Sequence, residues 1–88
     1  MVMTYKVEFR PEVEKDIQNL DKEVIKRIFQ KIKWLSENFE YITPEALKGD
    51  WKGKFKLTVG NYRVIYSVNY NLNIITIHLI GHRKDIYK

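Results

Sequence analysis

The hydrophobic pattern changes its period near the middle of the chain. Before residue 48, apolar side chains recur mainly at three- and four-residue intervals, whereas from residue 54 onward they alternate with polar ones. The first spacing is typical of a helix with one buried face, and the second of a strand with one buried face. The pattern therefore predicts helices in the first half of the chain and strands in the second.

A short strand and two helices are predicted in the first half. Alternating apolar residues over positions 2–9 favour the strand. Pro11 suits the start of a first helix, and Asp21 is a good N-cap for a second. A single helical turn is expected at Thr43-Pro44. The predicted buried stripes are Val13, Ile17 and Leu20 in the first helix, and Ile25, Ile28, Phe29, Ile32, Leu35 and Phe39 in the second.

Three strands are predicted in the second half, over residues 54–59, 62–69 and 73–80. The first two are separated by Gly60-Asn61, a two-residue hairpin signal. The predicted element order is β-α-α-β-β-β in one domain, residues 1–88. We expect an α+β fold in which the two N-terminal helices pack on one face of a mainly antiparallel four-stranded sheet.

The turn also predicts the hairpin register. With Gly60-Asn61 as the turn, Val59 pairs with Tyr62 and Lys56 with Ile65. A slip of one residue would bury the lysines, so burial favours this register. The expected core face holds Phe55, Leu57, Val59, Tyr62, Val64, Tyr66 and Val68, and the expected open face holds Lys54, Lys56, Thr58, Arg63, Ile65 and Ser67.

Positive charge is concentrated in the second half of the chain. Residues 1–47 carry eight Lys/Arg and nine Asp/Glu, a net charge of −1. Residues 48–88 carry eight and two, a net charge of +6, which accounts for the total of +5. Cations at strand spacing lie on one side of a sheet, so the expected open face is a surface for a polyanion.

Several classes of protein are disfavoured by composition. The chain has no cysteine, which excludes disulfides and thiolate metal sites. No Gly-rich phosphate loop, HExxH motif or cluster of metal ligands is present, so we expect neither a metal nor a cofactor. The chain lacks a secretory signal and a membrane-length apolar run, which favours a cytoplasmic protein. His78 is interpreted as a structural or rim residue of the last strand.

Cationic side chains suit RNA chemistry. Cleavage through the RNA's own 2′-hydroxyl needs a base, cations for the developing phosphorane charge and a proton donor for the leaving oxygen. Lys and Arg supply cations, and crowded cations favour a neutral lysine that can act as a base. A face that only binds phosphate is the simpler alternative. We expect Lys48, Lys52 and Lys84 to bind RNA rather than react.

Three sequence segments resemble one family. They are Lys54-Phe55-Lys56-Leu57, Gly60-Asn61-Tyr62-Arg63-Val64-Ile65-Tyr66 and Gly81-His82-Arg83-Lys84-Asp85-Ile86-Tyr87. With Phe9-Arg10-Pro11 and Leu47-Lys48-Gly49, they make the whole chain similar to the RelE family of toxins from toxin–antitoxin systems. The resemblance implies an endoribonuclease that cleaves mRNA in the ribosomal A site without metal, through 2′-OH attack and a 2′,3′-cyclic phosphate.

The resemblance also implies roles for individual residues on the strands. Lys54 and Lys56 match strand lysines associated with base and charge-stabilising roles. Arg63 matches an arginine held against the scissile phosphate.

Further roles are implied near the C-terminus. Arg83 matches an arginine linked to leaving-group protonation or charge stabilisation, and Tyr87 resembles a tyrosine that stacks on a codon base. Arg83 and Tyr87 are closer together than in the best-studied branch of the family. His82, beside Arg83, is expected to share acid–base work.

The implied partners are the ribosome, mRNA and a cognate acidic antitoxin of the RelB type, with no membrane. Two alternatives remain open. A toxin of the same fold can inhibit a protein target such as DNA gyrase without cutting RNA, and a non-catalytic module can bind RNA.

Overall fold

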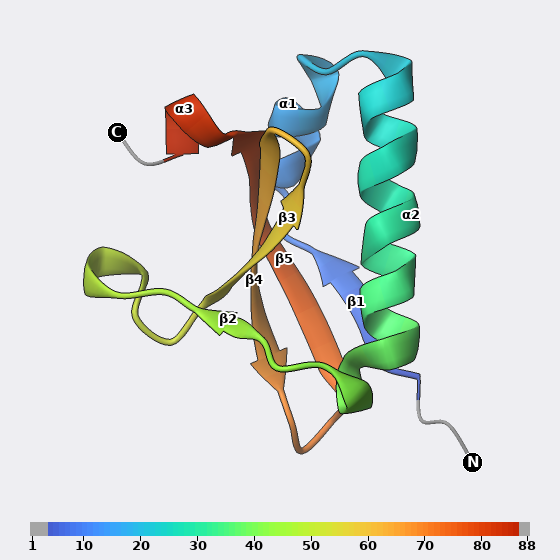
Figure 1. Ribbon diagram of the computed structural model, residues 1–88, viewed down its shortest axis with the longest axis vertical. Helices are drawn as coiled ribbons and strands as arrows, with labels where there is room; N and C mark the ends of the chain where they lie inside the picture. Colours follow the sequence, from blue (N-terminus) through green and yellow to red (C-terminus); the bar gives the residue numbers. More distant parts are fainter. Residues whose placement is uncertain (1–3, 87–88) are drawn as a thin grey trace.

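Three layers make up the molecule, with a twisted sheet between a long helix and a short C-terminal one (Figure 1). The computed structural model describes residues 4–86. The strands are β1 (Lys6–Phe9), β2 (Glu45–Ala46), β3 (Phe55–Val59), β4 (Tyr62–Asn69) and β5 (Ile74–His82), and the helices are α1 (Val13–Gln18), α2 (Lys22–Asn38) and α3 (Arg83–Ile86), with 3₁₀ turns at Phe39–Tyr41 and Gly49–Trp51.

The described residues form a five-stranded sheet in the order β1-β5-β4-β3-β2. β1 pairs with β5 in parallel, and the other neighbours pair antiparallel. The α+β class and the mainly antiparallel sheet are as predicted. The prediction of four strands missed β2, and the predicted element order missed α3.

The β3–β4 hairpin has the predicted register. Val59 pairs with Tyr62, Thr58 with Arg63, and Lys56 with Ile65. Gly60 has a φ of 58°. A positive φ at the first turn residue is typical of a type II′ turn and is accessible to glycine without steric cost.

The core lies between the sheet and α2. Leu35 on α2 is 0% exposed, as are Val64 on β4 and Ile75 and Ile77 on β5. Burying such side chains contributes about 1.5–3 kcal/mol each. The predicted stripe of α2 is confirmed at Ile28, Ile32 and Leu35, whereas Phe29 remains exposed and stacks edge-on against Phe9.

The connection from α2 to β2 differs from prediction. The expected helical turn at Thr43-Pro44 is wrong, because the turn occurs at Phe39–Tyr41 and Ile42 is already extended. A residue before proline is disfavoured in the helical region, which argues against a helical turn at Thr43. The chain then pairs Glu45 with Lys56 and Ala46 with Phe55.

A β-bulge in β5 changes which residues face which side. Ile65 pairs with Leu79 but Tyr66 pairs with Ile77, so His78 is the extra residue. The shift places Gly81 opposite Arg63. It therefore puts the glycine, rather than Ile80, on the face away from α2.

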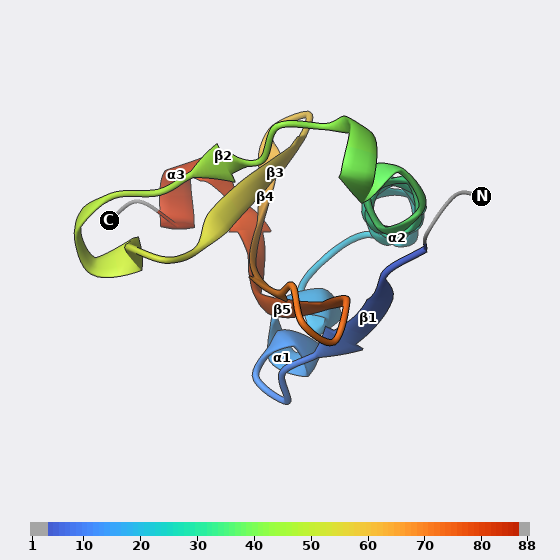
Figure 2. The same cartoon turned by 90° about the horizontal axis from the view of Figure 1, so that it is seen from below.

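Gly81 gives room for α3. A Cβ at position 81 would lie 3.2 Å from Cγ1 of Ile86, so the isoleucine packs where a side chain would otherwise project. The N–H of Arg83 donates to the carbonyl of Asn61 at 2.8 Å. These contacts hold α3 against the sheet on the side opposite α2 (Figures 1 and 2).

The part of β5 beyond β1 is capped by α1. β1 pairs with β5 only as far as Ile77. Three residues later, the N–H of Ile80 donates to Asp16 Oδ2 at 3.0 Å. A side-chain carboxylate thus takes the place of a strand carbonyl, and a buried backbone donor is satisfied.

We expect Asp16→Ala to lower the free energy of unfolding by about 1–3 kcal/mol, because the Ile80 N–H loses its acceptor. Asp16→Asn keeps an acceptor oxygen and should cost less. Glu14→Ala, an exposed change on the same helix, should stay within about 0.5 kcal/mol. Urea unfolding measures all three, and equal values for Asp16→Ala and Glu14→Ala would contradict the capping role.

Candidate functional site

The candidate site is the sheet face turned away from α2, called here the open face. Both views place α3 and the loop between β2 and β3 on this side of the sheet (Figures 1 and 2). The pairing register arranges it in rows across the strands. These rows are Thr58–Arg63–Gly81, Lys56–Ile65–Leu79, and, one step beyond the Phe55–Tyr66 pair, Lys54–Ser67.

Arg63 occupies the centre of the first row, and its side chain is bound to the backbone of the hairpin turn. Its Nη1 donates to the carbonyls of Gly60 and Tyr62, both at 2.9 Å. Among the described residues, its buried Nε has no hydrogen-bond partner. Two backbone acceptors therefore orient the guanidinium plane, while one buried donor is left unsatisfied.

Arg83 joins Arg63 at the hairpin turn. Its backbone N–H is bound to Asn61, next to the Gly60 carbonyl that holds Arg63. The side chain of Arg83 is exposed at the start of α3. The turn thus anchors both arginines, one through its side chain and the other through its backbone.

The two strand lysines have different surroundings. Lys56 Nζ lies 3.5 Å from Glu45 Oε2, an ion pair formed between paired residues of β2 and β3. Lys54 is half-buried, and its carbonyl accepts from the N–H of Leu47. Lys56 lies in β3 and Lys54 directly before it, and Glu45 partly neutralises Lys56.

An apolar floor separates the cations. Ile65 is 0% exposed and Ile86 is 8% exposed, yet neither belongs to the main core under α2. Both belong to the side of the sheet that α3 covers. Apolar surroundings exclude water and strengthen the electrostatic effect of Arg63 and Lys56, which flank Ile65 in the rows.

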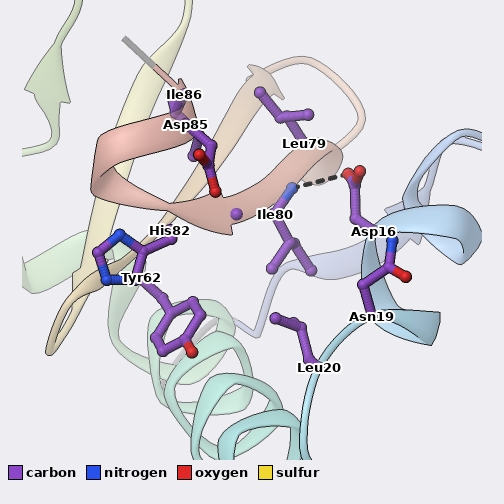
Figure 3. A pocket seen from close by; sticks show the side chains of 10 residues that line it. Asp16, Asn19, Leu20, Tyr62, Leu79, Ile80, His82, Asp85 and Ile86 are labelled. Atoms are coloured by element: carbon purple, nitrogen blue, oxygen red, sulfur yellow. Dashed lines mark hydrogen bonds between the residues drawn. The ribbon is translucent and has the colours of Figure 1, made fainter. Parts of the chain in front are cut away.

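His82 is not on the open face. It pairs with Tyr62, and the two rings meet edge-on with centroids 5.4 Å apart. Figure 3 shows it lining a pocket that follows the edge of β5 and has a volume of about 460 Å³. Leu20 and Asp16 line the same pocket. The expected grouping of His82 with the strand cations is therefore not seen, because the bulge turns it toward Tyr62.

The remaining expected residues lie around the open face or outside the described chain. Lys48 and Lys52 are exposed on either side of the 3₁₀ turn at Gly49–Trp51, and Lys84 is exposed on α3. Tyr87 lies outside the described residues.

His78 was not expected at the site, yet it lies on the open face. Its Nε2 is 2.7 Å from Ser67 Oγ. Burial lowers the pKa of His78, and the positive charges of Lys54 and Arg10 lower it further, while Glu12 opposes them. The lowered pKa favours the neutral form of the imidazole. Nothing in the sequence marks the bulge that exposes it.

Within residues 4–86, no group of three or more His, Asp or Glu side chains could hold a metal ion. No helix in that range is long and apolar enough to cross a membrane.

Solved structures with similar folds are toxins and toxin–antitoxin complexes. The RelBE2 complex from Mycobacterium tuberculosis matches with a TM-score of 0.83 and 21% identity, covering 97% of this chain and 98% of that one. The RelE–RelB complex from Pyrococcus horikoshii matches at 0.73 and 28%, covering 94% and 99%. A mutant E. coli RelE toxin in the free state matches at 0.77 and 20%, covering 96% and 88%. The fold is that of the RelE toxins.

Residues 7–87 match the family model described as the ParE toxin of the type II toxin–antitoxin system parDE. No curated protein matches the chain. The chain belongs to this family within the RelE/ParE superfamily, and it is the toxin of a type II toxin–antitoxin system.

The Glu45–Lys56 pair generates a binding prediction. We expect Glu45→Gln to tighten binding of single-stranded RNA about two- to fivefold, because the Glu45 carboxylate then no longer competes with phosphate for Lys56. Glu37→Gln makes the same charge change at an exposed position of α2 and should have a smaller effect. Fluorescence anisotropy at fixed salt measures both. Equal effects would show that only net charge matters.

Proposed function

We propose that this toxin is a ribosome-dependent endoribonuclease that cleaves mRNA on its open face. The observation that carries the proposal is Arg63 on the open face, whose guanidinium is oriented by two backbone carbonyls of the hairpin turn. A preoriented arginine suits the charge that develops on a phosphorane. The match to RelE folds supports the same reading.

The proposed reaction is attack by the RNA's 2′-oxygen on the adjacent phosphorus. A 2′-O–P bond forms and the P–O5′ bond breaks, leaving a 2′,3′-cyclic phosphate and a 5′-hydroxyl. The 2′-hydroxyl gives its proton to a base, and the 5′-oxygen receives one. No metal or cofactor enters this scheme.

Arg63 would hold the phosphate oxygens, and Arg83, anchored at the same turn, would stabilise the departing 5′-oxygen. Lys56 and Lys54 would supply the base and further positive charge. His82 points toward Tyr62, so a role in proton transfer would require its side chain to move.

The ribosome has a defined part in this proposal. Two arginines and two lysines bind phosphate but impose little order on a flexible strand. A strand already held in the A site would present the 2′-oxygen in line with the leaving oxygen, which removes much of that entropic cost. We therefore expect weak activity on free RNA.

The proposal is tested on purified ribosomes programmed with a short mRNA, with cuts mapped by primer extension. Arg63→Ala should slow cleavage about 10²- to 10³-fold, as expected when one oriented donor is lost from a transition state. Arg83→Ala should also slow it. Arg27→Ala, an exposed change on α2, should leave the rate unaltered.

No cut by the unaltered protein would overturn the nuclease proposal. A cut that survives both arginine substitutions would instead overturn the residue assignments. Cleavage of naked RNA at the ribosomal rate would contradict ribosome dependence.

We also propose an acidic antitoxin of the RelB type as the partner, acting in the cytoplasm. The open face and its surrounding lysines suit a negatively charged segment, and opposite charge speeds association. Complexes of similar toxins with RelB support this choice.

Inhibition of DNA gyrase is a second candidate, favoured by the match to the ParE family model. If it operates, the protein should block supercoiling of relaxed plasmid by purified gyrase in the absence of RNA. If the open face does not contact gyrase, Arg63→Ala and Arg27→Ala should affect inhibition equally. Full supercoiling at a large molar excess of toxin would exclude this function.

A further inference from the structure

The Ser67–His78 pair forms a second polar feature on the open face, separate from the arginines. The bulge in β5 leaves His78 without a partner on β4, and bulges commonly re-aim side chains next to functional sites. Here the imidazole reaches Ser67 Oγ, with 2.7 Å between the two atoms. Both residues are partly exposed.

Charged groups from two segments, the end of the loop before β3 and the loop between β1 and α1, act on His78. Lys54 falls opposite Ser67 when the β3–β4 register is extended by one step. Lys54 and Arg10 both act electrostatically on His78, and Glu12 acts in the opposite sense. The pair is thus a neutral hydrogen-bonding unit beside cations.

The pair lies too far from Arg63 to serve the same phosphate. Ser67 and Arg63 are four residues apart on β4, which corresponds to roughly 13 Å at about 3.3 Å per residue. Lys56 occupies the row between them. An RNA strand running along β4 from Arg63 would therefore bring a neighbouring nucleotide to Ser67 and His78.

We propose that Ser67 and His78 bind the base of a nucleotide flanking the scissile phosphate and contribute to sequence preference. This inference rests on the proposed nuclease function. A serine hydroxyl both donates and accepts, and a neutral imidazole has one N–H and one acceptor nitrogen. Such a pair distinguishes bases by their hydrogen-bonding edges, whereas a lysine such as Lys54 attracts any phosphate.

The first test follows binding without cleavage. The labelled full-length protein is titrated to millimolar concentration with a short RNA whose 2′-oxygens are methylated, so that 2′-OH attack is impossible. NMR resonances of the His78 imidazole and the Arg63 Nε–H are recorded. In a matched series of oligonucleotides, each strand lacks one base but keeps every phosphate.

We expect both resonances to shift with the intact strand. Loss of one flanking base should remove the shift at His78 and leave that at Arg63. A shift at His78 that persists with every abasic strand would overturn base recognition, and so would a shift at Arg63 alone. If neither residue responds at this RNA concentration, the open face does not bind the strand outside the ribosome and base recognition by Ser67 and His78 is overturned, whereas the nuclease proposal is judged by ribosomal cleavage.

The second test measures preference during ribosomal cleavage. A library of mRNAs randomised around the A-site codon is cleaved and sequenced. His78→Ala and Ser67→Ala should each reduce discrimination at one position by roughly two- to tenfold, the net effect of one neutral hydrogen bond. His78→Gln, which keeps a donor and an acceptor, should retain part of it.

Gln30→Ala, an exposed change on α2, serves as the control and should keep the original preference. An unchanged profile in both His78→Ala and Ser67→Ala would overturn the inference even where cleavage is normal. Urea unfolding of each variant separates altered preference from loss of folded protein.

Discussion

The two-residue turn at Gly60-Asn61 is the constraint on which both the fold and the site depend. Gly60 has a positive φ, and the turn fixes the register of β3 against β4. A slip of one residue would exchange the two faces of β3. The same turn supplies the Gly60 carbonyl to Arg63 and the Asn61 carbonyl to the backbone of Arg83. The geometry that selects the core therefore also aligns the arginines.

Sequence pattern could predict this hairpin because apolar and cationic residues alternate along β3. The last strand offers no such contrast, because apolar residues occupy both odd and even positions. The hydrophobic pattern therefore does not reveal the bulge at His78. The faces of His78 and His82 could not be predicted for that reason. β2 has only two residues, too few to display a period. Only the structure shows that β2 pairs with β3.

The bulge determines how the chain ends against the sheet. Without the extra residue, Ile80 would lie opposite Arg63 and its side chain would occupy the open face. With the extra residue, Gly81 takes that position and Ile86 packs over it. The docking of α3 brings Arg83 to the turn. The extra residue in β5 therefore helps to determine where Arg83 lies, although Arg83 follows Arg63 by 20 residues in the sequence.

Concentrating cations on one face is unfavourable unless something reduces their repulsion. The register spreads the cations over successive rows, and Glu45 lies 3.5 Å from Lys56, the cation of the middle row. The carboxylate thus occupies a place that a substrate phosphate would also favour. A carboxylate from the proposed antitoxin would suit the same cations, because carboxylates and phosphates are bound by the same donors. Substrate phosphates and antitoxin carboxylates would then compete for the same cations. Glu45, which already pairs with Lys56, would compete with both.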